Sequence, residues 1–81
     1  MNVYVMVVAE GLSGVHLASQ VMPDGCHYQE FRHLMTEEIN ACVEGLKVGG
    51  ANRVIVRDAH ASGSNVIWSL LTDQADGYSP D

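Results

Sequence analysis

A single amphipathic stripe in the middle of the chain constrains the fold more than any other feature of the sequence. Its apolar side chains are spaced three, four, four, three and four residues apart, which is the period of one face of an α-helix. The pair Gly49-Gly50 then ends the pattern. The sequence therefore predicts one long helix over about Tyr28–Lys47. The stripe consists of Tyr28, Phe31, Met35, Ile39, Cys42 and Leu46.

Two apolar runs lie on either side of this helix. Asn2–Val8 and Arg53–Arg57 are rich in β-branched residues and are followed by polar or glycine-containing sequence, as is typical of buried strands. A strand, a long helix and a second strand form a βαβ unit, whose right-handed crossover makes the two strands parallel. A shorter apolar segment, Val66–Leu71, predicts a short helix that covers one sheet face, with Ser64 or Asn65 as its cap. We therefore expect an α/β fold.

The length of the chain limits it to one α/β segment, residues 1–81. A parallel sheet of two strands, with a third strand at most starting near Ala75, cannot cover both of its faces, whereas parallel sheets are buried on both. We expect the segment to be the amino-terminal part of a larger domain, or to complete itself by association as a homo-oligomer. The stretch Val15–Gly25 shows no sustained periodicity and predicts a surface connection.

The charge of the chain argues against one class of partner. Ten acidic residues stand against four basic ones, so the formal net charge is −6, and no basic cluster occurs. Such a chain would repel a phosphate backbone, and we expect no nucleic-acid partner. The longest apolar run, Val3–Ala9, is too short to span a bilayer and follows no positively charged segment. We expect no membrane association and a cytoplasmic location.

Side chains with metal-binding chemistry follow the carboxyl ends of both predicted strands. Glu10 comes just after the first strand, and Asp58 and His60 come at the end of the second. Parallel strands share a carboxyl edge, and this edge is where open α/β sheets bind ligands. Glu10 and His60 are therefore expected at one edge, although they lie 50 positions apart. The residues alone leave open that His60 is a hydrogen-bonded loop histidine.

Three separated motifs together resemble a known family. The similarity to the zinc-dependent D-aminopeptidases of bacterial dipeptide-transport operons extends over nearly all 81 residues. The resemblance implies an α/β metallopeptidase with a two-zinc site, which removes amino-terminal residues from short D-amino-acid peptides and assembles into stacked homo-oligomeric rings. The motifs are Ala9-Glu10-Gly11-Leu12-Ser13-Gly14, Leu34-Met35-Thr36-Glu37-Glu38-Ile39-Asn40 and Val56-Arg57-Asp58-Ala59-His60.

The resemblance also implies roles for individual residues. Glu10 and His60 match zinc ligands of the family, and Asp58 is expected to orient a ligand. Val8 stands where the family has a further aspartate ligand, and the other family ligands and a catalytic histidine lie beyond Asp81. A catalytic zinc takes about three protein ligands, so these residues alone do not complete a site, and no catalytic residue is assigned.

Two interpretations of function follow. In the first, the chain is the amino-terminal segment of a zinc aminopeptidase and is inactive by itself. In the second, it is a non-catalytic α/β module that associates with itself or with a partner and retains remnants of a metal site. The intact Asp58-Ala59-His60 motif favours the first interpretation, and Val8 favours the second.

Overall fold

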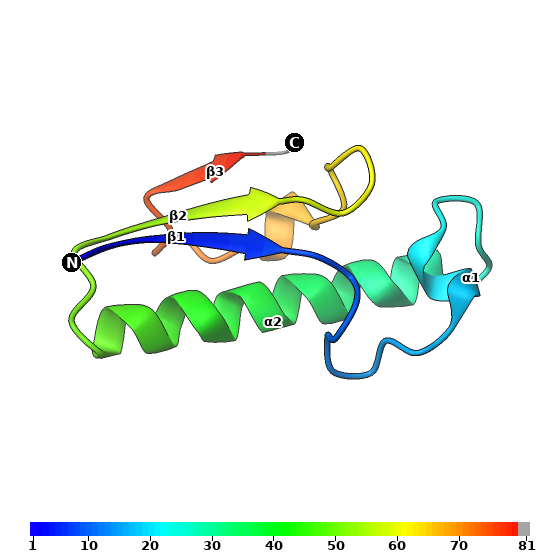
Figure 1. Ribbon diagram of the computed structural model, residues 1–81, viewed down its shortest axis with the longest axis horizontal. Helices are drawn as coiled ribbons and strands as arrows, with labels where there is room; N and C mark the ends of the chain where they lie inside the picture. The colour runs from blue at the N-terminus through cyan, green and yellow to red at the C-terminus, as the bar shows by residue number, and fades with distance from the viewer. Residues whose placement is uncertain (80–81) are drawn as a thin grey trace.

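Three parallel strands and one long helix form the architecture of residues 1–79, which the computed structural model describes (Figure 1). The strands are β1 (Asn2–Val7), β2 (Arg53–Asp58) and β3 (Gly77–Ser79), and β2 lies between the other two. The helical elements are α1 (Ala18–Val21), the long helix α2 (Tyr28–Val48) and a 3-10 turn, η1 (Trp68–Leu70). None of the helices in this part of the chain is both long and apolar enough to cross a membrane.

The pairing of the strands confirms the predicted βαβ unit. β1 and β2 are parallel, and their paired residues run from Asn2 beside Arg53 to Val7 beside Asp58. β3 pairs with β2 in the same direction. The third strand, expected to start near Ala75, begins at Gly77. The α/β fold with a long crossover helix is therefore confirmed.

Helix α2 covers one face of the sheet, and the core lies between them (Figure 1). Val54 and Val56 are fully buried on this face of β2, because alternate side chains of a strand point to the same side. Burying a side chain of this kind stabilises the fold by about 1.5 to 3 kcal/mol. The core cluster consists of Val7, Ala9, Phe31, Met35, Ile39, Val43, Val54, Val56 and Val66.

The predicted helical stripe is correct at Phe31, Met35 and Ile39 but wrong at Cys42. Cys42 is exposed, and the neighbouring Val43 is buried in its place. The buried line advances by four residues at each step from Phe31 to Val43. Side chains at i+3 and i+4 both lie near the same helix face, so the sequence pattern is compatible with either residue. The position of the sheet selects Val43.

One expected connection and one expected cap need correction. Val15–Gly25, predicted to be a surface connection, contains α1 and the buried side chain of Gln20. The short helix expected at about Val66–Leu71 is present as the 3-10 turn η1. Neither Ser64 nor Asn65 caps it, since the cap position is Ile67, whose own side chain forms no capping hydrogen bond.

Side chains of α2 hold the segment around η1. The Ile67 amide donates to the Thr36 hydroxyl at 2.9 Å. The Asn40 side chain donates to the Leu70 carbonyl and accepts from the Thr72 amide, both at 2.7 Å. These bonds satisfy backbone groups at the ends of the segment, which the single turn leaves without an internal partner. The segment therefore lies beside α2 as an irregular stretch.

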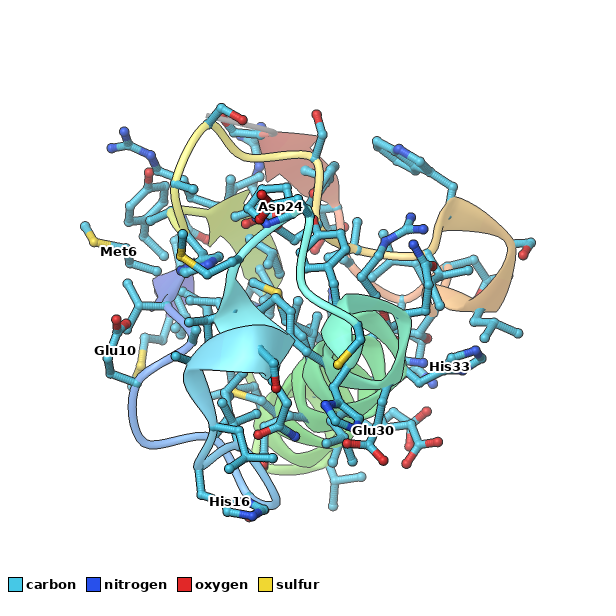
Figure 2. All side chains as sticks on the ribbon, turned by 90° about the vertical axis from the view of Figure 1, so that its right-hand side faces the viewer. Met6, Glu10, His16, Asp24, Glu30 and His33 are labelled. Atoms are coloured by element: carbon cyan, nitrogen blue, oxygen red, sulfur yellow. The ribbon has the colours of Figure 1, made fainter. Side chains whose placement is uncertain are left out.

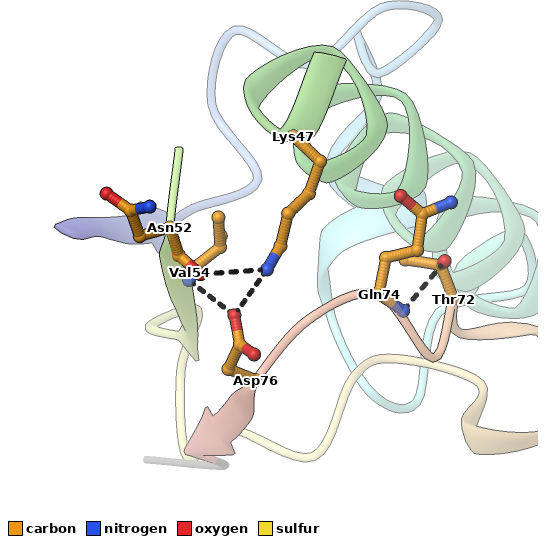
Figure 3. A network of polar contacts seen from close by, with 6 residues as sticks. All are labelled: Lys47, Asn52, Val54, Thr72, Gln74 and Asp76. Carbon is orange, nitrogen blue, oxygen red and sulfur yellow. Dashed lines mark hydrogen bonds and ion pairs between the residues drawn. The ribbon is translucent and has the colours of Figure 1, made fainter. Parts of the chain in front are cut away.

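An ion pair lies at the amino ends of strands β2 and β3 (Figure 3). The Lys47 ammonium lies 2.7 Å from the Asp76 carboxylate, and the same carboxylate oxygen accepts the Val54 amide at 2.8 Å. The hydrogen bond from Lys47, followed by the one from Val54, lowers the pKa of Asp76 below its usual range. The contact joins the end of α2 to the starts of β2 and β3.

The second face of the sheet is not covered by any part of residues 1–79 that the structure describes. Tyr4, Met6 and Val8 are 57%, 59% and 41% exposed there. Their β2 neighbours in the register are Ile55 beside Tyr4 and Arg57 beside Met6. An apolar face of this kind agrees with the expectation that these strands cannot bury both sides of the sheet.

Candidate metal-binding edge

The carboxyl ends of β1 and β2 lie side by side, and the candidate residues follow them. The Ala59 amide donates to the Val7 carbonyl at 2.8 Å, which extends the pairing past the end of β2. Glu10 and His60 therefore both emerge at the carboxyl edge. In Figure 2, which faces this edge, Glu10 lies beside Met6 and away from His33 of α2. The parallel strands thus place both residues after the carboxyl ends of β1 and β2, while the pocket that Glu10 lines does not include His60.

Glu10 is an exposed carboxylate on a turn. The turn closes through a hydrogen bond of 3.3 Å from the Leu12 amide to the Ala9 carbonyl, and Gly11 adopts a φ of 96°, which side chains rarely permit. Among the described residues, none forms a hydrogen bond or ion pair with the Glu10 carboxylate. Glu10 lines an open pocket of about 320 Å³ beside β1, together with Val8 and Glu38. Its oxygens are available to a cation.

His60 is partly buried, and its ring has fixed neighbours. Its Nε2 lies 2.7 Å from the carbonyl oxygen of Val21, in α1. The edge of the ring packs against Phe31, with ring centres 5.2 Å apart and planes at 67°. Among the described residues, no hydrogen bond involves its Nδ1. His60 is thus a hydrogen-bonded histidine, the possibility that the residues alone left open. One of its ring nitrogens, Nδ1, stays unpaired among the described residues.

Asp58 is a completely buried carboxylate surrounded by donors. Its side chain has 0% exposure, a position that a carboxylate tolerates only when it is hydrogen-bonded. It accepts bonds from both the backbone amide and the side-chain amide of Asn65, from the amides of His60 and Val66, and from the Tyr78 hydroxyl. The carboxylate therefore joins β2, the loop that carries His60, and β3.

The loop between His60 and Asn65 is held in an unusual conformation. Ala61 and Ser64 have φ values of 52° and 63°, in the left-handed region that costs a non-glycine residue about 1 to 2 kcal/mol. The side-chain amide of Asn65 donates to the His60 carbonyl at 2.8 Å and to Asp58 at 2.9 Å. The Tyr28 hydroxyl in turn donates to the Asn65 side chain. These buried bonds offset the backbone strain and fix the path of the loop.

The two tyrosines of this network ionise less readily than free tyrosine. Burial raises the pKa of Tyr78 far above its ordinary value of 10.0, and the negative charge of Asp58 and the hydrogen bond to it raise that pKa further. Burial also raises the pKa of Tyr28, although the nearby Arg32 lowers it in part. Both hydroxyls therefore remain protonated donors over the neutral pH range.

Two side chains at this edge have the chemistry of zinc ligands. A carboxylate and an imidazole are ordinary zinc ligands, and Glu10 and His60 each keep a donor atom that no described residue uses. Val8 contributes no donor, and no three His, Cys, Asp or Glu side chains within residues 1–79 are grouped closely enough to hold a metal ion. If they bound zinc, Glu10 and His60 would supply two of the about three ligands that a catalytic zinc needs.

Sequence reasoning did not identify two residues that build this edge. The sequence predicts Ser64 or Asn65 as a helix cap, whereas the Asn65 side chain links Asp58 to the His60 carbonyl. Gln20 is buried and ties α1 to its surroundings, yet it lies in a stretch without periodicity. A polar residue before an apolar segment suits a cap as well as a buried contact, so no pattern distinguishes these roles.

Comparisons with known proteins agree on one family. A family model for D-aminopeptidase matches residues 1–78. A D-aminopeptidase of Bacillus subtilis (strain 168) is 33% identical over all 81 residues. The solved structure of the zinc-dependent D-aminopeptidase DppA of Bacillus subtilis, described as a self-compartmentalizing protease, superimposes with a TM-score of 0.90 at 34% identity. The chain is matched over its full length in both comparisons and spans 30% of the length of each relative.

Replacing the buried carboxylate should weaken the whole edge. Asp58→Asn places an amide NH₂ group opposite donors such as the Asn65 amide, so buried donors lose their partner. We expect a loss of about 2 to 4 kcal/mol in the free energy of unfolding, measured by urea denaturation. Asp73→Asn, an exposed acid-to-amide change, should lose less than about 0.5 kcal/mol. Equal losses in the two variants would contradict the role of Asp58.

The raised pKa of Tyr78 should make the protein sensitive to alkali. Above about pH 10 the unfolded chain loses the Tyr78 proton while the folded chain retains it, so the free energy of unfolding falls as the pH rises. Tyr78→Phe removes this group. We expect the variant's free energy of unfolding to fall less steeply than that of the wild type between about pH 9.5 and 11.5. Parallel curves in urea denaturation would show that Tyr78 is not responsible.

Proposed function

The chain belongs to the D-aminopeptidase family, and on that basis we propose that it is the amino-terminal segment of a zinc aminopeptidase acting on short D-amino-acid peptides. In this proposal the segment removes no residue from a peptide by itself, because it supplies only part of a metal site. The observation that supports the proposal is the parallel register of β1 and β2, because Glu10 and His60 follow the carboxyl ends of these two strands.

The chemistry of the two side chains suits this role. The Glu10 carboxylate offers a hard anionic oxygen, and the His60 imidazole offers a neutral nitrogen. A bound zinc would lower the pKa of its water towards about 7, which supplies a nucleophile for peptide hydrolysis. Asp58 holds the backbone on which His60 stands, and we propose that it thereby orients this ligand. The remaining ligands come from outside residues 1–79.

The second candidate function is a non-catalytic module, and Val8 is the observation that favours it. The family resemblance puts Val8 at the position of a zinc ligand, and Val8 is 41% exposed and lines the same pocket as Glu10. A valine there supplies no metal bond, so a zinc site built around this chain would lose one donor. The two candidates differ in whether the edge binds zinc and whether an added donor strengthens that binding.

We also propose that the chain self-associates through the open face of its sheet. The apolar side chains Tyr4, Met6 and Val8 are exposed together on that face. Contiguous exposed apolar surface on one side of a sheet is typical of an interface. The structural relative is described as self-compartmentalizing, which supports association between copies in this family.

Restoring a carboxylate at the family position should strengthen zinc binding. We expect Val8→Asp to raise the zinc affinity of the chain at least about tenfold, equivalent to about 1.4 kcal/mol, in calorimetric titration. Tyr4→Asp adds the same charge on the same face but farther from the edge, and should leave the affinity unchanged. Glu10→Ala and His60→Ala should each abolish the gain.

The outcome of this titration separates the candidates. Equal affinities in Val8→Asp and Tyr4→Asp would mean that added charge alone attracts zinc, and would contradict the metal-site proposal. Wild-type chain that cleaves a D-alanyl peptide, with the activity lost in His60→Ala, would contradict the proposal that the segment is inactive by itself.

Association through the open face should respond to a charge placed on it. We expect the wild type to sediment as a species larger than 8.8 kDa at tens of micromolar, and Met6→Lys to shift it towards the monomer. Burying a lysine in an apolar interface is costly, which explains the shift. Val48→Lys makes the same change at a 90% exposed site on α2 and serves as the control. Monomeric wild-type protein at this concentration would exclude the interface.

A further inference from the structure

The hydrogen bond between His60 and Val21 determines which ring nitrogen carries the proton. Nε2 of His60 lies 2.7 Å from the Val21 carbonyl oxygen, and a carbonyl oxygen can only accept. In the neutral imidazole, Nε2 is therefore the N–H donor. Nδ1 then carries the lone pair, because a neutral imidazole has one donor and one acceptor nitrogen.

The ring is also prevented from turning or shifting. Phe31 packs against its edge with ring centres 5.2 Å apart. The backbone of His60 is held on both sides, since its amide donates to Asp58 and its carbonyl accepts from Asn65. A histidine held at its backbone, at its ring edge and at Nε2 presents Nδ1 in one direction.

The Val21 carbonyl has a fixed position because Gln20 anchors α1. The buried side chain of Gln20 accepts the amides of His16 and Leu17, both at 2.8 Å. It donates to the Gly14 carbonyl and to the Glu30 carboxylate of α2, both at 3.0 Å. These four bonds use both N–H donors and both oxygen lone pairs of the Gln20 side-chain amide. Gln20 thus ties the segment before α1 to α2, immediately beside Val21.

We propose that α1 is a positioning element of the metal-binding edge: the Val21 carbonyl, held in place through Gln20, fixes the Nε2–H form of His60 and presents Nδ1 as the metal-binding nitrogen. Metal-bound histidines almost always donate their other N–H to a carbonyl, a carboxylate or water, which fixes the tautomer and the ring orientation. The contact with Val21 is of this kind. The metal-binding half of the inference, that Nδ1 binds the metal, rests on the proposed function. The other half, that Nε2 carries the proton, does not.

The tautomer can be measured directly on the 81-residue chain. Long-range ¹H–¹⁵N correlation spectra of uniformly ¹⁵N-labelled protein at about pH 8, where imidazoles are mostly neutral, distinguish a protonated from an unprotonated ring nitrogen. We expect His60 to be protonated at Nε2. Added zinc chloride should then shift the Nδ1 resonance and leave Nε2 protonated.

A substitution of Gln20 tests the anchoring of α1. Gln20→Leu keeps the bulk of the side chain but removes its bonds, so His60 should show a mixture of both tautomers and zinc affinity should fall about 10- to 100-fold. Ser19→Ala is the matched control in α1. It removes a hydroxyl bonded to His27 and should leave both the tautomer and the affinity of the wild type unchanged. Amide spectra of both variants establish that the sheet and α2 remain folded.

The possible results separate this inference from the proposed function. His60 protonated at Nδ1 in the wild type, or zinc that shifts Nε2 instead of Nδ1, would overturn the inference while leaving zinc binding intact. A Gln20→Leu variant that is folded and keeps the wild-type tautomer would also overturn it. Zinc that changes neither nitrogen of an Nε2-protonated His60 would overturn the proposal that His60 binds zinc in this chain, together with the metal-binding half of the inference, while the tautomer assignment would stand.

Discussion

The buried carboxylate of Asp58 is the interaction on which the rest of the structure depends. It ends β2 inside the protein, and its charge is tolerated because five donors surround it. Through Asn65 it reaches the Tyr28 hydroxyl on α2, and through Tyr78 it reaches β3. A polar network that is satisfied in this way selects one conformation, since any rearrangement leaves a buried group unpaired. The helix, the loop and the edge strand are therefore positioned by the same group.

Two sets of contacts hold His60 in place at the candidate metal edge. The first set is the hydrogen bonds of Asp58 and Asn65, which hold the backbone of the loop after His60 in a conformation that costs energy. The second is the hydrogen bond between the His60 ring and the Val21 carbonyl of α1. Glu10 has no comparable support among the described residues and stands exposed on its turn. One ligand of the proposed site is thus prearranged, while the other keeps its freedom until a cation binds.

The uncovered sheet face and the partial metal site have a common explanation. A parallel sheet in an α/β protein is buried on both faces, and a catalytic zinc has about three protein ligands. Residues 1–79 provide one covered face and two donors, and the chain spans 30% of the length of its relatives. A layer over the open face, and any further zinc ligands, would have to come from outside these residues, either from other parts of the family fold or from another copy of the chain.

Local sequence patterns were sufficient to predict α2, β1 and β2, because hydrophobic periodicity depends only on neighbouring residues. The parallel direction of the strands follows from the crossover helix, and with it the position of Glu10 and His60 after the carboxyl ends of the two strands. The tertiary structure alone decided that Val43 rather than Cys42 enters the core, because that depends on where the sheet lies against the helix. It also decided the contacts of Asp58, Asn65 and Gln20 and the hydrogen bond from His60 to Val21. Those contacts join residues up to 39 positions apart, and their energies depend on burial and direction, which no local pattern contains.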